Sequence, residues 1–247
     1  MRIVYLSNSA IPSRTANSIH VMKMCQAFAR AGHRVALVAP DNPAEYERGV
    51  TDVYGFYGVE PAFSIRRLPL LPVKPWVFYG LFAALYAKWH RPGLAYGRDR
   101  TACYFASLLR VPLVFESHMP DREGGSDRVL ETIISSPMFW HLVVITDALG
   151  RHYSSRHPLL SGRIVVAPDG ADPVPVTGGP VPLAQDNARI RVGYTGHLYP
   201  GKGMEVISRL VPRCPWADFH IIGGTEEDIR SWKKRIGEQD KIGRAHV

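Results

Sequence analysis

Short apolar runs alternate with segments of helical periodicity along most of this chain, and this alternation constrains the fold more than any other feature. The apolar runs are only a few residues long, whereas the segments between them place apolar residues three or four positions apart. Strands that alternate with helices predict parallel β-α-β units, and therefore an α/β fold built on doubly wound parallel sheets. The predicted strands are Ile3–Leu6, Val35–Val38, Ser64–Leu68, Leu94–Tyr96, Val111–Phe115, Leu142–Ile145, Ile164–Val166, Arg189–Tyr194 and Phe219–Ile222.

A proline-rich segment, PVPVTGGPVP at Pro173–Pro182, interrupts the alternation and is typical of a linker. We therefore predict a Rossmann-like domain at 1–175, a linker at 176–188 and a second, incomplete domain at 189–240. The last residues, 241–247, follow no periodicity and match the translation of a common sequencing adapter. We expect that tail to be non-native.

Charge and cysteine usage limit the class of partner and the compartment. The chain has 30 Lys and Arg against 22 Asp and Glu, a net charge of +8 that favours anionic partners. The three cysteines, Cys25, Cys103 and Cys214, are far apart and show neither a disulfide framework nor metal-ligand spacing. The start MRIVYLSNS leads directly into a strand pattern rather than a signal peptide. We therefore expect a cytoplasmic protein.

The segment Pro75–Trp89, PWVFYGLFAALYAKW, is the most apolar part of the chain. It is shorter than the roughly 20 residues that a spanning helix needs. We favour a helix packed on a sheet. The alternative is an interfacial patch whose basic flanks contact an anionic membrane, on the inner face of the cell membrane.

The first strand-to-helix connection, Ser7–Ser18, is long and contains no glycine, which argues against a nicotinamide-binding Rossmann site. Ser13, Arg14 and Asn17 offer hydrogen-bond donors beside a helix N-terminus, so we predict that they contact an acceptor or another polar ligand. The alternative is helix capping alone. For His20, one turn into the helix, we favour packing over a functional role.

His118 follows the strand pattern VPLVFES and therefore lies at the ligand-binding edge of a parallel sheet. Its ring can donate to a sugar hydroxyl or hold a neighbouring carboxylate, and we predict that it is a catalytic residue. Glu116 lies two residues earlier on the same face of that strand. The alternative is that His118 only caps the loop that follows.

The strongest local motif is RVGYTGHLYPGKGMEVI, Arg191–Ile207. Gly196 and His197 begin a turn, and Lys202 and Gly203 precede a helix pattern, so the motif predicts a cradle for a diphosphate. Its spacing is not that of a P-loop. The alternative is a plain turn with a solvated lysine.

Four motifs occur in order: VVITDALGRHY, IVVAPDGAD, RVGYTGHLYPGKGM and FHIIGGTEED. Together with the start SNSAIPSRTANSIHVMKMCQAFARAGHRVALV, they make the chain resemble glycosyltransferase family 4, of the GT-B fold and the type that builds bacterial polysaccharide and cell envelope. The resemblance extends from Met1 to about Ile236.

The resemblance implies roles for particular residues. Lys202 matches the lysine that binds the donor diphosphate, and His197 stands where the family usually has arginine. Gly223 and Gly224 match glycines near the nucleotide, and His118 matches a histidine near the transferred sugar. Two hinge positions also match, Gly170 and Asp172, while Asp169 stands where asparagine is usual.

The family's EX7E glutamate pair has no counterpart after Ile236. We therefore expect a C-terminally truncated chain that is inactive as given.

The function that this resemblance implies is retaining transfer of a sugar from a nucleotide-diphosphate sugar to a glycan or lipid-linked acceptor. It implies no cofactor and no catalytic metal, and no Asp-x-Asp pair occurs in the chain. A sugar-nucleotide 2-epimerase of the same fold is an alternative within the enzymes. A basic nucleic-acid-binding protein is the alternative outside them, although we expect no nucleic-acid partner, because no recognition module is found.

Overall fold

The computed structural model describes residues 1–121, 127–173 and 189–236. The chain divides into two units, Met1–Asp172 and Pro173–Val247. The predicted linker at 176–188 and the predicted non-native tail at 241–247 lie outside the described residues.

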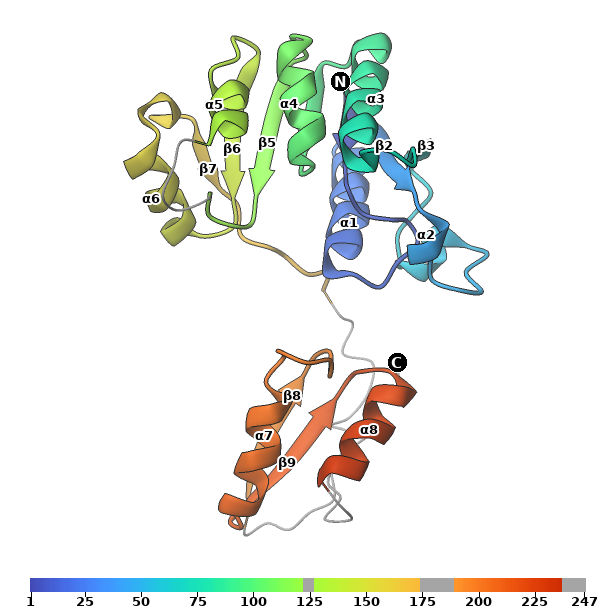
Figure 1. Cartoon of the computed structure of the whole chain (residues 1–247), viewed down its shortest axis with the longest axis vertical. Helices are drawn as coiled ribbons and strands as arrows, with labels where there is room; N and C mark the ends of the chain where they lie inside the picture. The colour runs from blue at the N-terminus through green and yellow to red at the C-terminus, as the bar shows by residue number, and fades with distance from the viewer. Residues whose placement is uncertain (122–126, 174–188, 237–247) are drawn as a thin grey trace. The chain divides into compact units, whose positions relative to one another are not determined.

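The first unit is built on a seven-stranded sheet in the order β3-β2-β1-β4-β5-β6-β7, and all of its paired strands are parallel. This sheet confirms the predicted α/β fold (Figure 1). The strands are β1 (Arg2–Leu6), β2 (Arg34–Asp41), β3 (Ser64–Pro69), β4 (Leu94–Gly97), β5 (Leu113–Ser117), β6 (Phe139–Val144) and β7 (Ile164–Val166).

Helices and short turns connect these strands. The helices are α1 (Ala16–Arg30), α2 (Val53–Phe56), α3 (Pro75–His90), α4 (Arg100–Leu108), α5 (Arg128–Ile134) and α6 (Asp147–Arg156), with single 3₁₀ turns at Pro43–Glu45 and Pro158–Leu160. Within the described ranges, no helix is both long and apolar enough to pass through a bilayer.

Two apolar clusters cover the two faces of the sheet. One contains the buried residues of α3, α4 and α5, and the other contains those of α1 and of the segment around α2. Because both faces are covered, β1 and β5 read as nearly continuous apolar runs rather than alternating ones. Gly32, just after the C-cap of α1, has φ of 82°, the left-handed conformation that commonly ends a helix.

The strand order reverses between β1 and β4, which pair side by side. The connection after β1 and the connection after β4 run to opposite faces of the sheet. Such a switch point leaves a crevice at the carboxyl ends of the strands. The connection after β1 and the connection after β4 line that crevice, so the order of the sheet fixes where a ligand site can form.

The second unit pairs β8 (Ile190–Thr195) with β9 (Ala217–Ile222) in parallel. The helices α7 (Met204–Leu210) and α8 (Glu226–Ile236) and a 3₁₀ turn at Val211–Arg213 complete its described part. A small core of Leu198, Met204, Ile221 and Trp232 holds these elements together.

Candidate functional site

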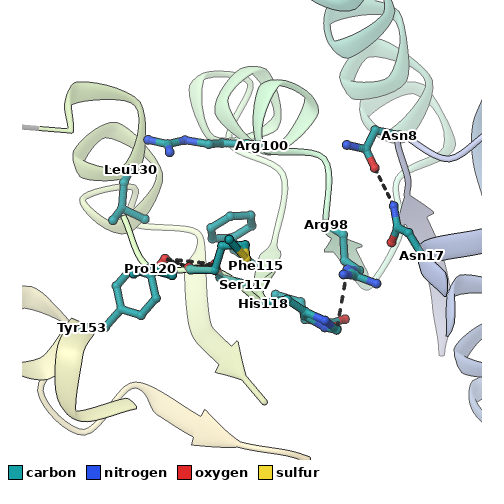
Figure 2. A pocket seen from close by; sticks show the side chains of 12 residues that line it. Asn8, Asn17, Arg98, Arg100, Phe115, Ser117, His118, Pro120, Leu130 and Tyr153 are labelled. Atoms are coloured by element: carbon teal, nitrogen blue, oxygen red, sulfur yellow. Dashed lines mark hydrogen bonds and ion pairs between the residues drawn. The ribbon is translucent and has the colours of Figure 1, made fainter. Parts of the chain in front are cut away.

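Two adjoining cavities open at the carboxyl edge of the first sheet. The smaller has a volume of about 240 Å³ and the larger about 520 Å³, and they share Asn8, Asn17, Arg98 and Arg100 in their walls. Asn8 follows β1 and Arg98 follows β4, so both cavities lie at the switch point of the sheet. Figure 2 shows Arg98 close to His118, with Asn8 and Asn17 to one side and Leu130 and Tyr153 to the other.

His118 is one of the residues that line the smaller cavity, and its Nε2 is in hydrogen-bond contact with Oε1 of Glu116. Glu116 is 3% exposed, because β5 is covered on both faces. Its second oxygen accepts a hydrogen bond from the hydroxyl of Tyr5 at 3.4 Å. The guanidinium Nε of Arg98 lies 3.8 Å from Oε1. The buried carboxylate of Glu116 therefore holds the imidazole ring of His118 in position.

The protonation of this pair follows from its surroundings. Burial alone would raise the pKa of Glu116, but the contacts with His118 and His20 and the charge of Arg98 hold that pKa well below its usual range. An ionised carboxylate can only accept hydrogen bonds. Nε2 of His118 must therefore carry a proton, and in the neutral form of the ring Nδ1 is then the nitrogen with a free lone pair.

His20 completes this cluster from the second turn of α1. Its Nε2 lies 2.9 Å from Oε1 of Glu116, and its ring meets that of His118 edge to face at 5.0 Å between centroids. Its Nδ1 lies 3.3 Å from a carboxylate oxygen of Asp169, in the segment after β7. The contacts of His20 thus connect α1, β5 and the segment that follows the sheet.

A metal site is an alternative interpretation of this cluster, because the ligand atoms of His20, Glu116 and His118 all lie within 4.8 Å of one another. Nε2 of His118, however, contacts Oε1 of Glu116 directly. That contact leaves no space for an ion between the two atoms, and the charge of Arg98 on the same oxygen opposes a cation. We interpret the cluster as a hydrogen-bonded histidine–carboxylate pair.

The three residues predicted to contact ligand in the first connection occupy different positions. Asn17 lines both cavities and donates a hydrogen bond to Asn8 at 2.9 Å. Its own Oδ1 is buried and finds no donor among the described residues. Ser13 lines the larger cavity, but its hydroxyl is bonded to Thr15. Arg14 lines neither cavity and pairs with Glu47 at 2.9 Å.

Asp121 anchors the connection that follows His118, a role that no sequence pattern predicted. Its buried carboxylate contacts His152 at 2.5 Å and His157 at 3.0 Å, both near the C-terminal half of α6. Burial alone would raise the pKa of Asp121, but hydrogen bonds with His152, His157 and Arg156 lower it to about 2. Asp121 is therefore bonded to His152 and His157, at α6 and its C-terminal end, through an ionised carboxylate.

Side chains of the 196–203 loop in the second unit gather around Tyr199. The ring of His197 stacks on Tyr199 at 5.3 Å between centroids, and Nζ of Lys202 lies 5.3 Å from the same ring. The hydroxyl of Tyr194 donates to the backbone oxygens of His197 at 2.7 Å and Lys202 at 3.0 Å. This bonding orders the 196–203 loop and leaves His197 and Lys202 exposed.

Close contacts or positive φ angles favour glycine at Gly223 and Gly224, after β9, and at Gly203 in the 196–203 loop. A Cβ on Gly223 would lie 2.1 Å from the backbone oxygen of Gly196, and a Cβ on Gly224 would lie 2.6 Å from the side chain of Leu198. Gly203, the residue before α7, has φ of 93°. The ends of β8 and β9 thus approach more closely than side chains would allow.

Comparisons with known proteins identify the family of the chain and structures of similar fold. A family model described as Glycosyltransferase Family 4 matches residues 18–174. The solved apo structure of WaaB, a lipopolysaccharide outer core galactosyltransferase, is similar with a TM-score of 0.62 and 11% identity, over 99% of this chain and 67% of that one. A glycosyltransferase from Rickettsia africae ESF-5 is similar with a TM-score of 0.64 and 12% identity, over 99% of this chain and 67% of that one.

A UDP-GlcNAc 2-epimerase from Neisseria meningitidis, solved with UDP-GlcNAc, is similar with a TM-score of 0.57 and 10% identity, over 100% of this chain and 72% of that one. At such identities the likeness shows the fold alone. The chain spans about two thirds of the length of the first two structures. No curated protein sequence matches it significantly.

Proposed function

Because the chain belongs to glycosyltransferase family 4 and has a fold of the GT-B type, we propose that it transfers a sugar from a nucleotide-diphosphate sugar to a glycan or lipid-linked acceptor with retention of configuration. The observation that carries this proposal is the His118–Glu116 pair in the wall of the smaller cavity. It lies within the residues that the family model matches. We infer a role in polysaccharide or cell-envelope synthesis.

His118 is the residue that we assign to the transferred sugar. With Nε2 bonded to Glu116, Nδ1 of the neutral ring can accept a hydrogen bond from a sugar hydroxyl. Such a contact orients the donor for transfer. We assign no covalent nucleophile, so the departing diphosphate must be stabilised by fixed donors and charges.

The diphosphate is the ligand that we assign to the loop of the second unit. Lys202 and His197 flank Tyr199 and are exposed, so both can turn toward an anion while Tyr194 holds the loop backbone. The glycine backbone at Gly196 and Gly203 supports a close approach of phosphate oxygens. Gly223 and Gly224, which pack against Gly196 and Leu198, fit a role beside the nucleotide.

The acceptor is assigned to the larger cavity. Oδ1 of Asn17 is a buried oxygen without a donor among the described residues, and a hydroxyl of the acceptor would satisfy it. Arg98 and Arg100 line the same cavity and offer guanidinium donors for further oxygens. A polyhydroxylated acceptor fits this set of groups.

Incubation of the full-length protein with UDP-, GDP- and ADP-sugars tests the proposal directly. We expect release of a nucleoside diphosphate that depends on added glycan or lipid-linked acceptor and that continues in the presence of a chelator. A donor sugar that is instead inverted at C2, without any acceptor, would identify a 2-epimerase and overturn the proposal. Proton NMR of the nucleotide sugar distinguishes the two reactions.

A further inference from the structure

The outer face of α3 carries an apolar stripe that the other described elements leave largely exposed. Val77, Leu81, Leu85 and Trp89 follow one another at four-residue intervals, and the stripe spans about 18 Å. Val77 and Leu85 are each 45% exposed and Trp89 is 84% exposed. The opposite face of the helix is buried against α4 and the sheet, so the stripe is not needed for the core.

Basic side chains surround a cavity at the C-terminal end of this helix. Lys88, Arg91 and Arg110 line a hollow of about 310 Å³ whose walls contain no carboxylate from the described residues. In the described part of the chain, the Lys and Arg ion pairs involve other side chains: Arg14, Lys23, Arg30, Arg98, Arg100, Arg156 and Arg189. The hollow is therefore a site of concentrated positive charge.

Residues with positive φ angles also lie around α3. The non-glycine residues with positive φ in the described part of the chain are Lys74, Arg91 and Arg110, with φ of 44°, 44° and 54°. Lys74 and Arg91 cap the two ends of α3, and Arg110 follows α4. Glycine adopts this conformation without strain. Three basic residues thus occupy positions where local structure favours glycine, and a role for their charges explains that choice.

The charge around α3 is also one-sided in the sequence. No Asp or Glu occurs between Glu60 and Asp99, although the same stretch contains six Lys and Arg residues: Arg66, Arg67, Lys74, Lys88, Arg91 and Arg98. An apolar stripe within a segment of only positive charge is complementary to an anionic lipid surface. A protein partner of ordinary composition would not require that this segment lack Asp and Glu entirely.

We propose that α3 docks the first unit on an anionic membrane, with the stripe among the lipid headgroups and the Lys88–Arg91–Arg110 hollow on lipid phosphate. The 16-residue helix lies on the membrane with its other face still packed on the sheet. This inference rests on the proposed function, and it selects the lipid-linked acceptor class. Trp76, in the first turn of α3, lines the larger cavity, so docking brings that cavity next to the lipids.

Vesicle partition of the chain tests this docking without any need for catalysis. We expect the wild-type chain to sediment with vesicles of mixed phosphatidylcholine and phosphatidylglycerol, and far less with phosphatidylcholine alone. Arg91→Gly with Arg110→Gly relieves two strained positions, so the fold is kept while two charges are lost. Partition should weaken about 25-fold, because each basic residue at such a surface contributes about fivefold. Trp89→Ser should weaken it about tenfold.

Matched controls are available on the same unit. Arg48→Ala with Arg151→Ala removes two exposed charges elsewhere, and Trp140→Ser removes another exposed tryptophan, 43% exposed on β6. Both should leave partition unchanged. The docking proposal is overturned if the chain binds neutral and anionic vesicles equally or binds neither. It is also overturned if the control variants lose as much partition as the α3 variants. So does a stable dimer that Trp89→Ser dissociates in the absence of lipid. If the protein transfers sugar to a soluble glycan but does not bind vesicles, the docking proposal is overturned and the proposed function stands.

Discussion

Nε2 of His118 contacts Oε1 of Glu116, a carboxylate that the fold keeps both buried and ionised. Glu116 lies in β5 and His118 directly follows the strand, so both are at the carboxyl edge of the sheet. The carboxylate fixes both the orientation of the imidazole and its tautomer. His118 therefore presents Nδ1 as a fixed hydrogen-bond acceptor.

Replacement of His118 by alanine tests its assignment to the sugar. We expect His118→Ala to lower turnover by roughly 100-fold or more, the scale of a lost positioning contact. Binding of the nucleoside diphosphate should stay nearly unchanged. Turnover, calorimetric affinity and melting temperature are measured on one preparation. Near-normal turnover with a lowered melting temperature would make His118 a structural residue.

Glu116→Gln keeps the shape of the side chain and removes its charge. We expect a loss of about 1.5–3 kcal/mol of unfolding free energy, because hydrogen bonds to a charged group are lost. Turnover should fall at least about tenfold and its pH profile should shift, since the tautomer of His118 is no longer fixed. Glu60→Gln, at an exposed site, is the control. An unaltered pH profile would contradict the pairing.

The same carboxylate predicts a dependence of stability on pH. The pKa of Glu116 is lower in the folded chain than the ordinary glutamate value of 4.5. Its contribution to stability is therefore present above that value and is lost as the pH falls below it. Urea unfolding followed from neutral to acidic pH should show a steeper loss in wild type than in Glu116→Gln. Parallel curves would contradict the assignment.

Lys202→Ala tests the diphosphate loop. We expect affinity for the nucleoside diphosphate to fall by about 10- to 150-fold, because a charge-assisted phosphate contact contributes about 1.5–3 kcal/mol. His197→Arg should retain or improve affinity. Lys233→Ala, in the last turn of α8, removes an equal charge outside the loop. Calorimetric affinity that is equal for Lys202→Ala and wild type would remove Lys202 from the site.

Asp99 is the N-cap of α4 and lines the larger cavity. Burial raises its pKa to about 6, although backbone hydrogen bonds from Ala102 and Thr101 act in the opposite sense. Because the folded chain binds this proton more tightly, stability falls as the pH rises from about 4 to about 6. Asp99→Asn keeps the cap and should add up to about 3 kcal/mol at neutral pH and little at pH 4 or below.

Thermal unfolding across that range checks the Asp99 prediction. Asp52→Asn, at the exposed cap of α2, controls for the substitution itself and should have no such pH dependence. A destabilised Asp99→Asn at neutral pH would show that ionised Asp99 has a stabilising partner.

Most strands could be predicted from the sequence because their β-branched runs are short and well separated. The β5 prediction was two residues early at each end, since the backbone N–H of Val111 still closes α4 by bonding to Ala106. The predictions did not include α6. Its sequence is mostly polar, and only Leu149, Gly150 and Tyr153 are buried, so its apolar periodicity is weak.

The candidate site, too, could be predicted from the sequence only in part. His118 could be placed at the ligand edge because it follows a predicted strand, and Asn17 because it lies where the first strand-to-helix connection enters its helix. The approach of His20 to Glu116 could not, because these residues are far apart in sequence and meet only through the order β1-β4-β5 of the sheet. The anchoring of Asp121 depends in turn on α6, which was not predicted.

The configuration of the product tests the central claim most directly. The full-length protein is given a nucleotide-diphosphate sugar of known anomeric configuration, and the new glycosidic bond is examined by proton NMR. Our account predicts a product with the configuration of the donor, formed by wild type and at least about 100 times more slowly by His118→Ala. An inverted product, or retention at equal rates in both proteins, would contradict it.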